Sequence, residues 1–454
     1  MSRKPTPSPS PEAVLEGLMD RAARAGSGEY EVMVGRGRSL AIAAKAGRVD
    51  QVRRSEELAA SVRLVSQGRL GFAHTSLFTP EALDRTVAQA AAGAELTDPQ
   101  PGLGLPGPPP GDWPVVETND PGLDDVSLEN KIDRLLEMEA AALEADPRVE
   151  KVRSAEYRQG RYAVWLANGH GLAYHHEGTV VSGGLTVKAA EDGEAEMGYE
   201  SEACRFYDRL DLKAIGREAA RRAVAALGGR PGRTGRFPVL LENRIAAQFL
   251  DVLSSSFLAD AVQKGKSMLA GRIGQTVAAA GISLVDDGLY PAGLATSPAD
   301  SEGTPRQRTV LIDRGRLAAF LYDFPRARVD GTSSTGNAGR GGVTSPPGVS
   351  TTNLYLSPGE IEPGDLTSRI DQGLLVTDVM GLHTADAISG DFSFGVSGFW
   401  IQGGRIAHPV KGMALAGNLF TLLEHVAEVG ADLRFFGSVG APSLLIEELT
   451  LSGM

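Results

Sequence analysis

Along the first 230 residues, segments whose apolar residues recur at helical spacing alternate with segments typical of strands. This pattern predicts two successive α+β units. Apolar residues recur at helical spacing over residues 12–25, 79–92, 128–144 and 211–227. Ser127 and the pair Thr79-Pro80 stand where a helix start is favoured. Between the helices, turn dipeptides such as Gln67-Gly68 separate runs typical of antiparallel strands. The expected strands cover residues 30–35, 39–44, 58–66, 69–75, 149–159, 161–167, 172–176, 180–189 and 194–200.

The pattern changes after a Gly-rich stretch at residues 229–235. A short apolar strand at residues 237–241 precedes a helix over residues 243–258, whose apolar residues share one face. The remainder shows short strands with glycine turns and one late helix over residues 418–429, which predicts a β-rich, barrel-like domain. The fold class is therefore α+β. The predicted divisions are a disordered tail at 1–11, an α+β domain at 12–97, a Pro/Gly linker at 98–126, a second α+β domain at 127–230 and a β-rich domain at 236–454.

Composition narrows the functional classes. The 56 glycines among 454 residues fit a chain with many tight turns. A formal net charge of −12 argues against direct nucleic-acid binding. No run of about 18 apolar residues and no secretory h-region occur, so we expect a cytoplasmic protein that spans no membrane. The lone Cys204 excludes an intramolecular disulfide and a Cys-rich zinc site, and we expect no chemical role for it.

The sequence offers no complete metal or catalytic motif. No histidine lies between His176 and His383, so the helix at 243–258 carries no H-E-x-x-H pair. His175 and His176 are neighbours on a predicted strand and point to opposite faces, which favours a structural role. The remaining histidines of the C-terminal half, His383, His408 and His425, are scattered. We therefore predict no catalytic residue, no metal site and no cofactor in this chain.

Three segments resemble familiar functional motifs, but the sequence around each one, or its spacing, excludes the function. The G-x-G-x-x-G at residues 102–107 is followed by a proline run in place of a helix, so it is not a dinucleotide site. Residues 265–267 resemble the end of a phosphate loop but follow a helix in place of a strand. The Gly/Ser/Thr run at 331–336 has the wrong spacing for a nucleophile elbow.

Three glycine-dense loops stand out, at residues 298–304, 333–342 and 389–400. Glycines at this density let the backbone approach a ligand closely, for example an extended peptide. The same density also suits tight turns around the rim of a barrel. The residues alone leave both interpretations open.

The ordered motifs of residues 299–453 resemble the TldD/TldE (PmbA) family. The resemblance is carried by D-S-E-G at 300–303, S-T-G-N-A-G at 334–339, T-N-L-Y-L with P-G at 352–359, G-D-F-S at 390–393, I-A-H-P-V at 406–410 and A-G-N-L at 416–419. The family was once described as modulators of DNA gyrase and is better understood as a two-subunit metallopeptidase. Its TldD subunit bears H-E-x-x-x-H on the first helix of the C-terminal domain and a late cysteine ligand, and neither is present here.

The resemblance thus implies a TldE/PmbA-like subunit without the metal motif. It would join a TldD-like metalloprotease subunit and help to enclose unfolded or small peptides. It implies a cleft formed by the helix at residue 243 and the loops at 336–342 and 390–400. The candidate peptide-binding residues are Asn337, Arg340, which would meet a carboxylate, Asp391, which would fix a turn or a peptide amine, Phe392 and His383.

Two other functions stay open at this stage. The first is a stand-alone peptide-binding or scaffold protein that needs no protease partner. A metal-independent hydrolase would need a nucleophile–base pair, and none is identifiable. Whether the chain also forms a homodimer is not decided by its residues.

Overall fold

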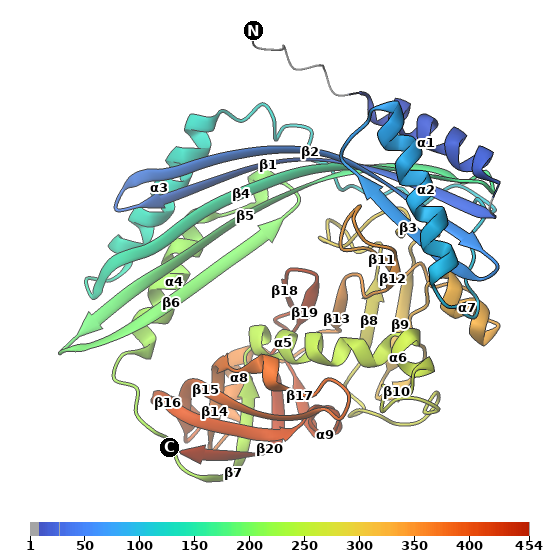
Figure 1. The fold of residues 1–454 in the computed structure, drawn as a ribbon. Coiled ribbons are helices and arrows are strands. Elements are labelled where there is room, and N and C mark those ends of the chain that lie inside the picture. The colour runs from blue at the N-terminus through green and yellow to red at the C-terminus, as the bar shows by residue number, and fades with distance from the viewer. Residues whose placement is uncertain (1–8, 27, 454) are drawn as a thin grey trace.

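The computed structural model describes residues 9–26 and 28–453. Most of the predicted disordered tail, residues 1–8, lies outside this range, and Pro11 is already the first residue of helix α1 (Pro11–Ala25). The fold is α+β, as predicted, with a large N-terminal sheet above a barrel-containing C-terminal unit (Figure 1).

The strands of both predicted N-terminal units form one sheet of six strands in the order β3-β2-β1-β4-β5-β6. The long central strand β1 pairs antiparallel with β2 on one side and with β4 on the other, which joins the two halves. Several predicted strand pairs are single continuous strands, because the polar residues between them stay in the ladder. The bounds are β1 Glu29–Lys45, β2 Arg48–Ser66, β3 Arg69–Thr75, β4 Val149–Asn168, β5 Ala173–Glu191 and β6 Glu194–Cys204.

Two helix pairs pack on the two ends of this sheet (Figure 1). Helix α1 packs with α2 (Pro80–Leu96), and α3 (Leu128–Ala145) packs with α4 (Leu212–Ala226). Each helix begins after a Ser, Thr or Asp side chain that accepts a backbone N–H of its first turn, and the helix starts predicted at Thr79 and Ser127 are confirmed. Each pair buries its apolar stripe against the strands in a separate core.

The C-terminal unit contains a closed five-stranded barrel in the order β16-β15-β14-β7-β20, closed by pairing of β16 with β20. Strand β17 extends the sheet beside β20. This confirms the barrel-like prediction. The bounds are β7 Gly235–Leu241, β14 Gln372–Met380, β15 Asp391–Gln402, β16 Arg405–Asn418, β17 Val426–Val429 and β20 Leu444–Gly453.

Another sheet of the C-terminal unit, with six strands in the order β10-β9-β8-β13-β19-β18, lies beside the barrel. Helix α5 (Asn243–Ser254) contacts strands of both sheets, and its residues Ile245, Phe249 and Leu253 lie in their common core. The bounds are β8 Leu284–Asp287, β9 Arg308–Asp313, β10 Arg316–Leu317, β13 Leu354–Leu356, β18 Arg434–Phe436 and β19 Val439–Ala441.

Short elements complete the chain. They are η1 Tyr207–Arg209, η2 Ser255–Phe257, α6 Ala259–Gln263, α7 Phe324–Asp330, β11 Ala338–Gly339, β12 Gly348–Val349, α8 Pro363–Ser368, η3 Leu382–Thr384 and α9 Leu419–Glu424. The late helix predicted over residues 418–429 is wrong in its second half. Helix α9 ends at Glu424, and residues 426–429 form β17, because Val426 and Val429 pair with β20.

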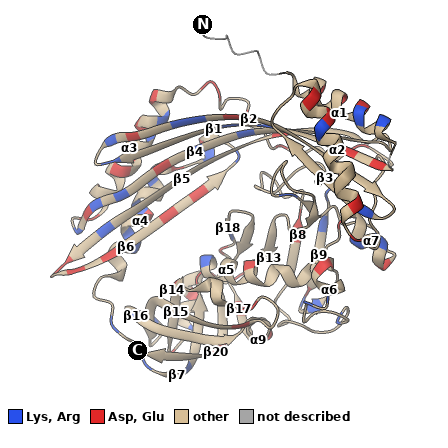
Figure 2. Cartoon of the chain, viewed as in Figure 1, with Lys and Arg blue, Asp and Glu red and all other residues tan. Residues whose placement is uncertain are grey.

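Charged residues of both signs are spread over the large sheet and its helices, whereas β14 and β15 are almost free of them (Figure 2). No helix within residues 9–26 and 28–453 is long and apolar enough to cross a membrane.

Helix α4 lies directly on strand β6 at Gly198, and this contact yields a stability prediction. A Cβ at Gly198 would lie 2.1 Å from the carbonyl oxygen of Ala219 and 2.5 Å from the nitrogen of Ala223. We expect Gly198→Ala to lower the free energy of unfolding by about 1–3 kcal/mol, because helix and strand must separate. Urea denaturation measures this. Gly37→Ala is the control, because no described residue lies within 4 Å of its added Cβ. Equal midpoints for the two variants would contradict the packing.

Candidate functional site

Two hollows flank the first turns of α5, and we call them together the α5 cleft. They measure about 530 and 680 Å³ and share Tyr199, Arg244 and Gln248 in their walls. Strand β6, the edge strand of the large sheet, lines both. The smaller hollow is completed by β4, β5 and residues 435–437, and the larger by α4 and the barrel strands β14, β15 and β16. The cleft therefore lies where the N-terminal sheet, α5 and the barrel meet.

A carboxylate–arginine cluster lies at the α5 cleft. Glu200 of β6, only 2% exposed, accepts hydrogen bonds from Arg244 and from Arg434, the latter at 2.9 Å. Arg222 of α4 lies 3.2 Å from the same carboxylate and also pairs with Glu242 at 2.9 Å. Three guanidinium groups thus surround one buried carboxylate.

The end of β7 places two members of this cluster. Strand β7 ends at Leu241, Glu242 is the N-cap residue of α5, and Arg244 lies in the first helical turn. The Arg244 guanidinium also lies over the ring of Phe436, 4.9 Å from its centroid. Burial raises the pKa of Glu202, the next acidic residue on this strand, which lines the smaller hollow. The walls of the cleft thus combine fixed charges with aromatic surface.

The residues of the cleft do not fit a resident metal ion. Glu200 and Glu242 are engaged by arginines, whose positive charges oppose a divalent cation. Across residues 9–26 and 28–453, no group of three or more His, Cys, Asp or Glu side chains has an arrangement that could hold one. Burial also raises the pKa of Cys204 to about 11, so its thiol stays protonated at neutral pH and is a poor ligand.

The histidines do not converge. His175 and His176 contact different aromatic partners: His175 lies against Trp165, and His176 lies near Tyr162 and Tyr174. This agrees with opposite faces of β5. His383 is exposed in η3, and His408 lies on β16.

The glycine-dense loops hold one another through their predicted motif residues. The Asn337 side chain is buried and donates to Asp286 Oδ1 at 2.8 Å and to Ser350 O at 3.0 Å. The hydroxyl of Thr352 and its backbone N–H donate to the same Asp286 carboxylate. The side chain of Asp300 accepts the backbone N–H of Ala338. Asn337 is therefore engaged within the loop framework and presents no surface to a peptide.

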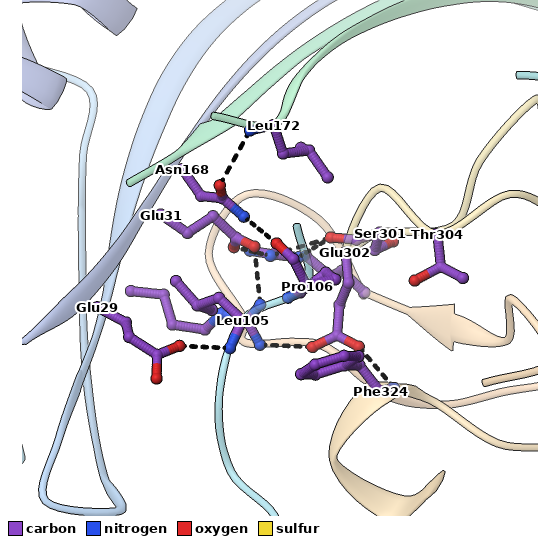
Figure 3. A network of polar contacts seen from close by, with 12 residues as sticks. Glu29, Glu31, Leu105, Pro106, Asn168, Leu172, Ser301, Glu302, Thr304 and Phe324 are labelled. Carbon is purple, nitrogen blue, oxygen red and sulfur yellow. Dashed lines mark hydrogen bonds and ion pairs between the residues drawn. The ribbon is translucent and has the colours of Figure 1, made fainter. Parts of the chain in front are cut away.

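Arg340 does meet a carboxylate, but that carboxylate belongs to the chain itself. Its buried guanidinium pairs with Glu31 of β1 and donates to Ser301 O. Glu31 also pairs with Arg63 at 2.7 Å, and Arg63 reaches Glu302 at 2.8 Å. Figure 3 shows Glu31 and Glu302 on either side of this network, together with the linker residues Leu105 and Pro106. We call these four charged residues the inter-unit quartet.

The quartet joins the N-terminal sheet to the C-terminal loops. Glu31 and Arg63 come from β1 and β2, whereas Glu302 and Arg340 come from the loops around residues 300 and 340. The linker is fastened at the same place, because Leu105 N donates to Glu29 and Asn168 donates to Pro106 O (Figure 3). The loop at 336–342 therefore packs against the large sheet, and it does not line the α5 cleft as the sequence suggested.

The other predicted residues lie elsewhere. Phe392 is buried between Phe249 and Phe394, with ring centroids at 5.5 and 4.8 Å, so it is a core residue. Asp391 is exposed and accepts a hydrogen bond from Asn418 at 2.8 Å, which ties the start of β15 to the end of β16. The structure does not bring the five predicted residues together in one cleft. Of the segment 390–400, residues 397–399 do line the larger hollow.

Sequence reasoning missed the residues that form the cleft cluster. Glu200, Arg222, Arg244 and Arg434 come from β6, α4, α5 and β18, far apart along the chain. No spacing rule connects them. The one available signal was Arg244, a charged residue at the start of the helix that in the resembled family carries the metal motif.

Comparison with known proteins covers nearly the whole chain. Family models of the PmbA/TldA metallopeptidase match as domain 1 over residues 30–94, as central domain over 121–227 and as C-terminal domain over 234–453. The chain is 27% identical over 449 residues to the metalloprotease PmbA of Escherichia coli O157:H7, covering 97% of this chain and 96% of that protein. It is 28% identical over 356 residues to a metalloprotease TldD homologue of Haemophilus influenzae, covering 73% of each chain. The crystal structure of TldE from Thermococcus kodakarensis has a TM-score of 0.88 at 24% identity, covering 97% of this chain and 100% of that one.

Proposed function

The chain belongs to the PmbA/TldD metallopeptidase family, and from this premise we propose that it is the subunit of a two-subunit peptidase that does not carry the catalytic metal. In this proposal it resembles TldE, works in the cytoplasm and assembles with a TldD-like metalloprotease subunit. Its task is to bind unfolded or small peptides beside the catalytic site of its partner, so that it contributes orientation and exclusion of water.

The observation that carries the proposal is the cluster at the start of α5. In the resembled TldD subunit, the first helix of the C-terminal domain carries H-E-x-x-x-H. Here the first helix of that domain starts with Glu242 and Arg244, both joined to the cluster around Glu200 and Arg222. The surrounding guanidinium groups stabilise this carboxylate without a metal. Because its oxygens are engaged by arginines, it offers no open coordination position to a metal ion.

The α5 cleft is the place that we propose for the peptide. Its walls combine Tyr199, Phe399 and Phe435 with charged groups at the cluster. Aromatic surface next to fixed charges suits a segment with varied side chains. Residues Asn337, Arg340 and Phe392 have no part in this proposal, because their side chains are already engaged inside the chain.

The test compares three samples: this chain, the TldD-like subunit of the same organism, and their mixture. We expect hydrolysis of an unfolded peptide only in the mixture, together with a stable complex by size-exclusion chromatography. After mild dialysis this chain should retain less than about a tenth of an equivalent of zinc or iron by elemental analysis, because a structural or catalytic zinc site needs three or four ligands. Peptidase activity of this chain alone, with a full equivalent of metal, would contradict the proposal.

A pair of matched variants tests the place of the peptide. Gln248→Trp fills the α5 cleft, whereas Gln275→Trp adds the same side chain at an exposed position outside it. We expect the first variant to raise the KM of the mixture, and the second to leave it unchanged. Equal effects would remove the peptide from this cleft while the two-subunit proposal stands. Peptide binding without any complex would instead support the stand-alone scaffold.

A further inference from the structure

A separate pocket of about 180 Å³ lies between strands β4 and β5 and the loop at residues 294–301. We call it the sheet–loop pocket. Side chains at every second position of the two strands face it, and cross-strand pairing puts Val164 opposite His176 and Leu166 opposite Tyr174. The remaining lining comes from Met33 of β1, Tyr162, Arg205 and Arg306. The pocket is mostly apolar and contains a few convergent polar groups, which is the usual composition of a small-molecule site.

His176 supplies one unused polar group. Its Nε2 atom is buried and has no hydrogen-bond partner among the described residues. The ring lies between Tyr162 and Tyr174, with centroids at 5.9 and 6.3 Å. Burial, reinforced by the charge of Arg205, lowers the pKa of His176 to about 4, so the ring is neutral at pH 7. In the Nε2–H tautomer it is a hydrogen-bond donor without a protein acceptor, on a side chain that lines the pocket.

The two arginines of the pocket differ in how many of their guanidinium nitrogens already donate to the protein. All three nitrogens of Arg205 do so, to Gly293 O, Leu294 O and the hydroxyl of Tyr162. Arg306 donates through Nε to Ser297 and through Nη1 to Gly336 O, which leaves Nη2. Arg205 therefore forms part of the pocket wall, whereas Arg306 Nη2 has no hydrogen-bond partner in the part of the chain that the structure describes.

The free donor of Arg306 favours an anion. Among the described residues that line the pocket, the carboxyl group is that of Asp300, whose oxygens already accept backbone N–H groups of Glu302, Thr304 and Ala338. Asp286 also acts on the charge of Arg306, but its oxygens accept hydrogen bonds from Asn337 and Thr352. An acceptor from outside the chain is therefore the partner left for Arg306 Nη2, and a small volume with an apolar floor restricts its carrier to a compact molecule.

We propose that the sheet–loop pocket binds a small monocarboxylate with a compact apolar or aromatic portion. The carboxylate accepts hydrogen bonds from Arg306 Nη2 and His176 Nε2, and the apolar portion packs on Val164, Leu166 and the tyrosine rings. The carboxylate belongs either to a free small acid or to the C-terminus of a peptide. This site is distinct from the α5 cleft and does not depend on the proposed subunit role.

The experiment uses the full chain and isothermal titration at pH 7.5 with benzoate, and with benzamide as its uncharged isostere. We expect benzoate to bind and benzamide to bind at least about tenfold more weakly, because a hydrogen bond to a charged group contributes about 1.5–3 kcal/mol. A second arm compares alanyl-phenylalanine with its C-terminal amide. Preference for the free dipeptide over benzoate identifies a peptide C-terminus, and the reverse identifies a free acid.

Variants locate the binding. Arg306→Gln should weaken benzoate binding about tenfold or more, and His176→Phe about two- to tenfold, because it removes one neutral donor and keeps the ring. His175→Phe is the matched control on the opposite face and should change nothing. If Arg306→Gln does not fold, the benzoate affinity of His176→Phe alone tests the proposal. Failure of both acids to bind, or binding that neither variant alters, would overturn the proposal and leave a pocket that holds water only.

Discussion

Replacement of Arg63 by methionine is expected to lower the free energy of unfolding by about 3–5 kcal/mol, because it strands a buried carboxylate. The Arg63 side chain is 2% exposed and holds Glu31 and Glu302 at 2.7 and 2.8 Å. Without it, Glu31 keeps Arg340 as a partner, whereas within residues 9–26 and 28–453 Glu302 keeps only the backbone N–H of Phe324. Equilibrium denaturation followed by tryptophan fluorescence measures the loss.

Two further variants separate charge from shape in this prediction. Arg36→Met removes an exposed arginine from β1, whose pair with Glu56 is open to solvent, and should cost less than about 1 kcal/mol. The double variant Arg63→Met with Glu302→Gln leaves the balanced pair Glu31–Arg340 and should recover part of the loss. If the double variant is less stable than Arg63→Met alone, the cost arises from lost packing and not from a stranded charge.

The quartet explains why the family-like loops could be located in the sequence but not interpreted. Arg340 was expected to meet a carboxylate, and it meets Glu31, which lies 309 positions earlier in the chain. No local pattern encodes a pair at that separation. Asn337 shows the same limit, because its partner Asp286 lies on β8, 51 positions away. The glycine-dense loops suit either a ligand-binding surface or tight turns by their sequence, and in the structure their polar side chains hold the loops to each other.

Local signals fared better than distant ones. The helix starts at Thr79, Ser127 and Asp211 were predictable, since a capping side chain acts on the turn that follows it. The turn at Gln67-Gly68 was likewise visible, and both residues have positive φ, at 52° and 73°. The joining of two predicted units into one sheet was not predictable, because it depends on pairing of β1 with β4, across more than a hundred positions.

The α5 cleft combines a feature that local sequence predicts with one that depends on residues far apart in the chain. The sequence identified its helix, and the absence of histidines there excluded the metal motif. It did not identify what replaces that motif, because Glu200, Arg222 and Arg434 reach the helix from three other elements. The apolar face of α5 is a property of one segment, whereas the charge cluster is a property of the assembled fold.

The second large effect that we expect is a reversed pH dependence at Asp323, the N-cap residue of α7. This side chain is 5% exposed, and its Oδ1 accepts the backbone N–H of Arg326 at 2.8 Å. Burial, together with the nearby charge of Glu302, raises the pKa of Asp323 to about 6. A raised carboxyl pKa adds stability below the unfolded value of about 3.9, and this contribution is lost as the pH rises through about 6.

Asp323→Asn removes that titration and keeps the cap, since asparagine is an equally good N-cap residue. We expect the variant to match the original chain near pH 4 and to exceed it at pH 7.5 by about 3 kcal/mol, which is about two pKa units at 1.36 kcal/mol each. Asp211→Asn, at the exposed N-cap of α4, is the matched control for the exchange itself. Denaturation at both pH values decides: a variant that is less stable than the original chain at pH 7.5 would show that Asp323 is stabilised as an anion. Because Glu302 is one of the charges that disfavour this anion, the same measurement in Glu302→Gln should show a smaller gain, which would connect the α7 cap to the inter-unit quartet through electrostatics alone.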